Sequence, residues 1–171
     1  GPTLGREAIN RGKLAFVIGT AAVIVFMMVY YKWSGAIAIA ALIFQFQIIL
    51  GFLAGFGATL TLPGMAGLIL TVGMSVDANV LILERIREEL RSGKTVRSSI
   101  DTGYRRAFWT ILDSNVTTLI TAIVLYEFGT GPIKGFAVTL SIGLIVNMFT
   151  AILVTREIYS WTYYRRRVLN R

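Results

Sequence analysis

The sequence predicts an all-α membrane protein built as a bundle of five transmembrane helices. Hydrophobic residues make up 55% of its 171 residues, charged residues make up 15%, and the mean hydropathy is +0.68. This composition is typical of a chain that lies in a bilayer. The apolar residues are grouped in five runs of about 18–22 residues each, the length that a helix needs to cross a membrane. The predicted spans are 14–31, 35–56, 64–83, 108–128 and 136–154.

The first run is predicted to be a span and not a signal peptide. It lacks a small-residue cleavage site, and four further spans follow it. The spans at 35–56 and 64–83 are separated by a turn at Leu62-Pro63-Gly64, and those at 108–128 and 136–154 by a turn at 129–132. Residues 1–13 form an entry segment, and residues 161–171 form a basic tail.

The segment 84–107 joins the third and fourth spans. Its first part is expected to continue the third helix to Arg91, where Ser92-Gly93 ends it. A short amphipathic helix beginning at Thr95 or Ser98 is then expected to lie along the lipid headgroups. Whether it serves as a connector or as a docking element is left open.

Orientation follows from the distribution of the 17 Lys and Arg residues. Five crossings place the two ends of the chain on opposite sides of the membrane, and the more basic side is expected to be cytoplasmic. The N-terminal side carries four: Arg6, Arg11, Lys13 and Lys134. The other side carries thirteen: Lys32, Arg85, Arg87, Arg91, Lys94, Arg97, Arg105, Arg106, Arg156, Arg165, Arg166, Arg167 and Arg171. Residues 1–13 are therefore expected to be extracytoplasmic, whereas 84–107 and 161–171 are cytoplasmic. An N-terminus outside the cell suggests that an earlier span and the domain it tethered are missing.

Composition also excludes several functions. The chain has no cysteine and no histidine, so disulfides, thiol nucleophiles and histidine relays are excluded, and protons must be handled by carboxylates or by a partner's residues. No nucleophile–base pair, metal-ligand set or phosphate loop is present, so we expect neither an enzyme nor a bound metal or cofactor. The basic residues behind the net charge of +8 lie at the ends of apolar runs. This placement is better explained by membrane topology than by nucleic-acid binding.

Asp77 is the most informative residue, because it lies within the third apolar run. A carboxylate at that depth costs about 2.5–3.5 kcal/mol on insertion scales, so such residues usually serve a proton or ion relay. The sequence has no Lys or Arg at matching depth. The acid must therefore be neutral part of the time or pair with a cation from another subunit. Asp113, nearer the end of its span, is either a second relay group or a structural one.

Further polar residues surround these acids. Asp77-Ala-Asn79 is echoed by Asp113-Ser-Asn115 on the next span, and Asn147 lies on the last. Counting ~1.5 Å per residue from the span ends places Asp77, Asp113 and Asn147 roughly 10, 9 and 13 Å deep. Asn79, Asn115, Asn147 and Thr117, the last one turn after Asp113, are expected to be polar groups that support the relay. For the asparagines, plain helix-to-helix hydrogen bonding is the favoured interpretation. The third helix is polar on two sides, which predicts a central place in the bundle.

Small residues predict where helices approach closely. Gly51 and Gly55 form a GxxxG pair on the second span, and Gly143 lies one turn before Asn147 on the fifth. Gly73 precedes Asp77 by one turn and is expected to admit a neighbouring helix.

Four sequence blocks carry a specific resemblance: VDANVLI, ERIREEL, TTLI and GTGPIKGFA, which begin at residues 76, 84, 117 and 129. With them, nearly the whole chain resembles the membrane domain of the SecD family of bacterial protein-export proteins, relatives of the resistance-nodulation-division (RND) transporters. The resemblance implies that the chain is half of a pseudo-symmetric bundle in the plasma membrane, completed by SecF and associated with the SecYEG channel. It further implies that the proton gradient drives polypeptide translocation.

The resemblance also assigns residues. The family's intramembrane aspartate falls on Asp77, and its Asp-x-Asn at the start of the next span falls on Asp113 and Asn115. The family's first span and its large extracytoplasmic domain, which captures the polypeptide, have no counterpart in this sequence, so no residue here is assigned to substrate binding. Two other functions remain open: a small-molecule exporter or proton antiporter subunit of the same superfamily, and a membrane scaffold without transport. The sequence also leaves open whether sodium replaces the proton.

Overall fold

The structure, a computed structural model, describes residues 2–57, 60–154, 156–157 and 160–161. It consists of five long helices and one short π-helical segment. These are α1 (Pro2–Tyr31), α2 (Trp33–Gly55), α3 (Leu62–Arg91), α4 (Val96–Phe128), α5 (Gly131–Phe149) and η1 (Thr150–Val154). All five helices are long and apolar enough to cross a membrane, and the described residues include no strand. The predicted fold class is confirmed.

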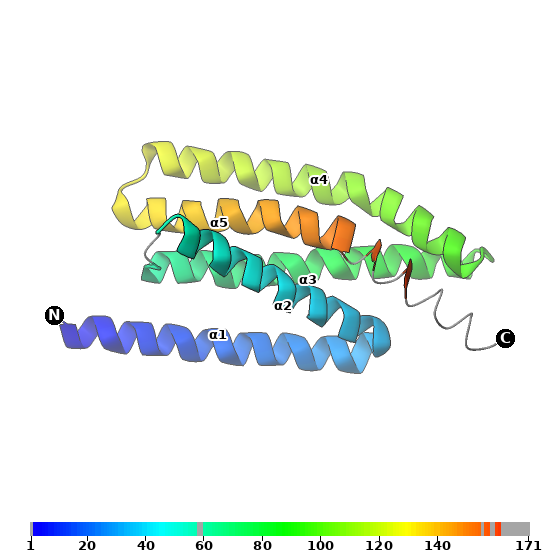
Figure 1. Cartoon of the computed structure of the whole chain (residues 1–171), viewed down its shortest axis with the longest axis horizontal. Coiled ribbons are helices and arrows are strands. Elements are labelled where there is room, and N and C mark those ends of the chain that lie inside the picture. Colours follow the sequence, from blue (N-terminus) through cyan, green and yellow to red (C-terminus); the bar gives the residue numbers. More distant parts are fainter. Residues whose placement is uncertain (1, 58–59, 155, 158–159, 162–171) are drawn as a thin grey trace.

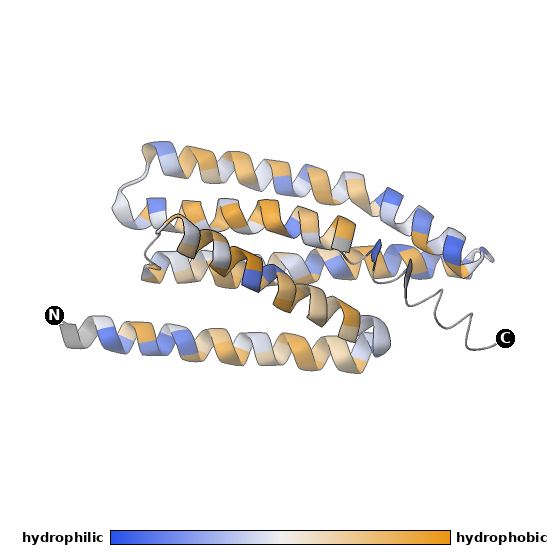
Figure 2. Cartoon of the chain, in the orientation of Figure 1, coloured by the Kyte–Doolittle hydropathy of each residue, from blue (hydrophilic) through white to orange (hydrophobic). Residues whose placement is uncertain are grey.

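The helices run alternately in opposite directions, and α3 is the centre of the bundle (Figure 1). It packs most extensively against α5 and α4, and also contacts α1 and α2. α1 lies at the edge, and α3 and α4 extend beyond the other helices at one end (Figure 1). Apolar residues fill the middle of the helices, whereas hydrophilic residues gather on the projecting ends of α3 and α4 and near the start of α1 (Figure 2). We call the end with the α3–α4 turn the basic end.

The boundaries of α3 and α4 follow from their capping residues. The Thr61 side chain accepts a hydrogen bond from the Gly64 N–H (3.1 Å), and the Thr95 side chain accepts one from the Ser98 N–H (3.2 Å). Between the two helices, Gly93 takes a φ of 92°, which glycine adopts without steric cost. The expected end of the third helix at Ser92-Gly93, and the expected start at Thr95, are confirmed.

The predicted separate helix along the headgroups is wrong, because α4 continues without a break from Val96 to Phe128. The reason is that the projecting part of α3 provides a packing partner. Ile86 of α3 belongs to one apolar cluster with Ile100 and Tyr104 of α4. A Cβ on Gly103 would lie 3.0 Å from the Ile86 nitrogen, so the two backbones touch there. The apolar face assigned to lipid is buried against protein.

α1 and α2 meet at a corner of one residue, which constrains its neighbours. Lys32 has a φ of 53°, in the left-handed region where side chains are strained. A Cβ on Gly35 would lie 2.7 Å from the Met27 carbonyl carbon, so only glycine fits at this position. This corner fixes the start of α2 at Trp33.

Candidate functional site

α3 carries polar side chains on two faces, and only one of these faces is buried within this chain. Ser75 is 0% exposed and Asn79 is 7% exposed; both lie on the buried side. Asp77 lies on an exposed side of the same helix. The central place predicted for the helix is confirmed by its contacts with every other long helix, but the Asp77 face is open at the surface of this chain.

Asp77 lines a groove between α3 and α4 with a volume of about 230 Å³. On α3 the groove is lined by Met74, Asp77, Ala78 and Leu81, and on α4 by Ile111, Ser114 and Asn115. The structure thus brings the predicted acid together with Asn115, one of the predicted supporting groups. One water molecule occupies ~30 Å³ in the liquid, so several waters fit beside the carboxylate.

Neither intramembrane carboxylate has a polar partner in the described part of the chain. Asp113 is exposed on α4 and does not line the groove. The Thr117 hydroxyl donates to the backbone carbonyl of Asp113 (2.8 Å), a local bond that satisfies the threonine without involving the acid. Two carboxylates that face outward from a membrane helix call for a covering group from outside this chain.

Asn115 connects the groove to α5. It is 6% exposed, and its Nδ2 donates to the Sδ of Met148 (2.8 Å). The side chain therefore lines the groove while bonding to the helix behind it.

The buried face of α3 takes part in a second polar cluster, formed by Gln45, Ser75 and Asn147 from three helices. The Ser75 hydroxyl lies within hydrogen-bonding distance of the Asn147 Oδ1 (3.0 Å) and of the Gln45 Oε1. A hydroxyl has one hydrogen, so it donates to only one of these carbonyls at a time. The Nδ2 of Asn147, itself 1% exposed, has no acceptor in the described residues. With the Asn147 amide turned over, its Nδ2 would donate to the Ser75 oxygen while the Ser75 hydroxyl donates to Gln45, so the hydrogen bonds of the cluster have more than one arrangement.

The predicted packing glycines divide into two groups. A Cβ on Gly143 would lie 2.9 Å from the Thr71 Cβ, so α5 and α3 are in close contact there. For Gly51, Gly55 and Gly73, an added Cβ would meet nothing within 4 Å. Their packing role stays a prediction, and it concerns partners outside this chain.

The sequence reasoning missed a second close approach of α3 and α5. A Cβ on Gly67 would lie 3.0 Å from the Phe136 carbonyl oxygen. One turn away, the Thr139 hydroxyl lies 2.9 Å from the Gly64 carbonyl oxygen and donates to it. Gly64 and Gly67 are three residues apart, and this spacing of small residues was the available signal.

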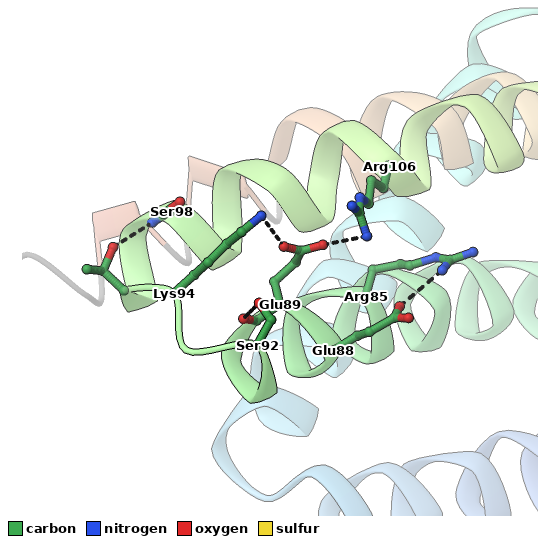
Figure 3. A network of polar contacts seen from close by, with 8 residues as sticks. Arg85, Glu88, Glu89, Ser92, Lys94, Ser98 and Arg106 are labelled. Carbon is green, nitrogen blue, oxygen red and sulfur yellow. Dashed lines mark hydrogen bonds and ion pairs between the residues drawn. The ribbon is translucent and has the colours of Figure 1, made fainter.

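The sequence reasoning also missed a buried carboxylate at the basic end (Figure 3). The Glu89 side chain is 4% exposed and forms ion pairs with Lys94 and with Arg106, the latter at 2.7 Å. The Ser92 hydroxyl donates to the Glu89 carbonyl (2.6 Å). These contacts join the last turn of α3 to the loop and to α4, so they hold the projecting hairpin as one unit. Sequence spacing alone does not place Arg106 beside Glu89.

A further polar link ties the edge helix to the centre. The Tyr31 hydroxyl, at the end of α1, donates to Glu84 of α3 (3.0 Å), and Arg87 pairs with the same carboxylate (3.3 Å). Among the described residues, no group of three or more His, Cys, Asp or Glu side chains is placed to hold a metal ion.

Five long apolar helices that pack through mainly apolar clusters, with a carboxylate unpartnered in the described residues beside a groove, define a multi-pass membrane protein. The chain belongs to the family described as "Protein export membrane protein SecD/SecF, C-terminal", which it matches over residues 1–165. The resemblance noted in the sequence is thereby confirmed.

Relatives from several bacteria share this region. The protein translocase subunit SecD of Syntrophobacter fumaroxidans is 57% identical over 168 residues, which are 98% of this chain and 32% of that protein. The protein translocase subunit SecD of Desulfurispirillum indicum is 62% identical over 159 residues, covering 93% of this chain and 31% of that protein. The chain thus spans about a third of the length of these relatives.

Solved structures show the same fold. The crystal structure of SecDF, a translocon-associated membrane protein from Thermus thermophilus, superposes with a TM-score of 0.93 at 45% identity. The match covers 96% of this chain and 23% of that one. SecDF in its super-membrane-facing form gives a TM-score of 0.90, also at 45% identity.

Proposed function

We propose that this chain is the membrane bundle of a SecD-type subunit that uses the proton gradient across the plasma membrane to assist polypeptide export. Family membership supports the export role, since the relatives are named protein translocase subunit SecD. The single observation that carries the coupling role is the Asp77 carboxylate, which lies in a groove between α3 and α4 whose lining includes no Lys or Arg.

The open face of Asp77 and Asp113 is the surface on which the second half of the bundle docks. Exposed carboxylates in a membrane span are costly in lipid, and a partner that covers them removes this cost. SecDF, to which the chain is similar, combines both halves in its name, which supports SecF as that partner. Association with the SecYEG channel, and contact with the translocating polypeptide through an extracytoplasmic domain, belong to the same proposal.

The proposed orientation places the start of α1 outside the cell and the basic end in the cytoplasm. The excess of Lys and Arg at the α3–α4 turn supports this orientation.

Protonation of Asp77 provides the switch in this proposal. The ionised acid attracts water or a partner cation into the groove, whereas the neutral acid allows the helices to close around it, so each form favours a different packing. The Gln45–Ser75–Asn147 cluster, whose hydrogen bonds have more than one arrangement, suits a bundle that changes its packing. A proton that crosses the field supplies about 2.3 kcal/mol per 100 mV, which shifts a two-state equilibrium more than tenfold.

The test is Asp77→Asn in the full-length subunit, reconstituted with its partners in proteoliposomes. Because Asn cannot ionise, we expect that an imposed proton gradient no longer stimulates polypeptide translocation, while complex assembly is retained. The matched control is Glu88→Gln, which removes an exposed carboxylate from the same helix at the basic end and should leave the stimulation intact.

Other outcomes would favour the other functions. If Asp77→Asn translocates as well as the parent protein under the same gradient, the coupling role is refuted and the chain is a scaffold. If the variant loses proton-coupled solute flux but keeps normal polypeptide export, the chain belongs to an antiporter. Replacing the proton gradient with a sodium gradient in the same vesicles identifies the coupling ion.

A further inference from the structure

A cleft of about 700 Å³ lies between α4 and η1 at the basic end, away from the Asp77 groove. Its lining is divided into two chemical parts. Tyr104, Phe108, Trp109 and Ile152 are aromatic or aliphatic, whereas Arg105, Arg156 and Asp101 are charged, two cations against one anion. The cleft therefore offers an apolar wall and a basic rim to one ligand.

The division between the two parts coincides with the edge of the membrane. The apolar run of α4 begins at Phe108, and that of the last span ends at 154. At ~1.5 Å per residue, Arg105 lies roughly 4–5 Å beyond Phe108 on α4, and Arg156 follows the end of the last apolar run in the sequence. Phe108 and Ile152 are thus at the depth of acyl chains, and the basic rim is at the depth of headgroups.

Both arginines are available to an outside anion. Arg106 pairs directly with buried Glu89, whereas Arg105 forms no ion pair in the described part of the chain and acts on Glu89 only at longer range, as one of the cations that lower the pKa of that carboxyl. Arg156 lies 3.4 Å from Asp101, which also lines the cleft, and the two side chains are 49% and 54% exposed. An ion pair this exposed contributes little to stability, so Arg156 can leave Asp101 for a stronger anionic partner. A phosphate is such a partner, because a guanidinium group donates two parallel hydrogen bonds to its oxygens.

Trp109 indicates that the ligand is a lipid and not a free anion. It is 68% exposed, and its ring packs edge-on against that of Phe108, with the centroids 5.2 Å apart. Exposed tryptophan is typical of the membrane interface, where its ring lies among headgroups. A free phosphate would use only the rim and leave the apolar wall uncovered.

We propose that this cleft binds an anionic phospholipid, with its phosphate between Arg105 and Arg156 and an acyl chain along Phe108 and Ile152. The bound lipid adds contacts between α4 and the end of the last span, which already pack together through Ala107 and Ala151. It would thereby stabilise the packing of two helices that belong to the proposed moving bundle.

The test is native mass spectrometry of the full-length subunit in complex with its membrane partner, released from detergent in the presence of dioleoyl phosphatidylglycerol. The reference lipid is dioleoyl phosphatidylcholine, which has the same acyl chains and no net charge. Each basic residue near an anionic surface contributes about 1 kcal/mol. The Arg105→Gln/Arg156→Gln double variant should therefore bind phosphatidylglycerol about 30-fold more weakly, which is ~2 kcal/mol at 1.4 kcal/mol per tenfold.

Two further variants keep the result interpretable. Arg91→Gln removes a charge from the same end outside the cleft and should leave phosphatidylglycerol binding unchanged. Arg105→Lys/Arg156→Lys keeps both charges and should bind phosphatidylglycerol well above the level of the glutamine variant. This comparison distinguishes a loss of binding caused by the missing charges from one caused by misfolding. Equal retention of the two lipids by the parent complex would overturn the proposal, as would unchanged binding in the glutamine variant. Displacement of the lipid by millimolar inorganic phosphate would identify a free-anion site and overturn it as well.

Discussion

The contact between α3 and α5 at Gly143 leads to a quantitative prediction for Gly143→Ala. The new Cβ would lie 2.9 Å from the Thr71 Cβ and would meet other side-chain atoms of Thr71 as well. Carbon atoms in good contact are about 3.5–4.0 Å apart, so the two helices must separate locally. Overpacking of this kind costs about 1–3 kcal/mol, and contact with several atoms of one residue favours the upper half of that range.

Helix propensity acts in the opposite direction. Replacing Gly by Ala inside a helix stabilises the helix by about 1 kcal/mol. Gly143→Ala should therefore lower the free energy of unfolding by a net ~1–2 kcal/mol. The same substitution at Gly73 provides a matched control, since an added Cβ there meets nothing within 4 Å. In the subunit alone, Gly73→Ala should therefore be neutral or stabilising by up to about 1 kcal/mol.

The free energy of unfolding of both variants can be measured in mixed micelles of mild detergent and SDS, with the full-length subunit and without its partner. The reasoning is refuted if Gly143→Ala proves as stable as Gly73→Ala. Repeating the measurement with the partner present tests the predicted packing role of Gly73, because a covering helix would make Gly73→Ala destabilising only in the complex.

Two further substitutions test the polar contacts. Ser75→Ala removes the hydroxyl that faces two amides and should lower the unfolding free energy by roughly 0.6–2 kcal/mol in the same SDS assay. A stability equal to that of the parent would show that this hydroxyl makes no net contribution to the packing of the three helices. Glu89→Gln weakens the pairing with Arg106 and should speed both amide hydrogen exchange and trypsin cleavage at the α3–α4 turn. Glu88→Gln, which alters an exposed pair, should change neither rate, and equal rates in all three proteins would exclude a clamping role for Glu89.

The sequence was sufficient for the fold class and for several helix ends. Long apolar runs can satisfy their backbone groups in a bilayer only as helices, so the number of spans followed directly. The end of α3 at Ser92-Gly93 and the start of α4 at Thr95 were also predictable, because capping depends on neighbouring residues. Where a long-range contact intervened, the prediction was wrong: α4 is one continuous helix because Ile86 covers its first turns.

The order of residues along the chain is enough to establish an all-helical membrane bundle with an acid, Asp77, in an apolar run. Which side of each helix is covered follows only from the packing of the folded chain. It turned Ser75 inward to Gln45 and Asn147, left Asp77 open beside Asn115, and buried Glu89 against Arg106. The physical reason is that hydrophobic length and capping are local properties, whereas the rotation of a helix about its axis is set by the close packing of glycine and side-chain surfaces from distant parts of the chain.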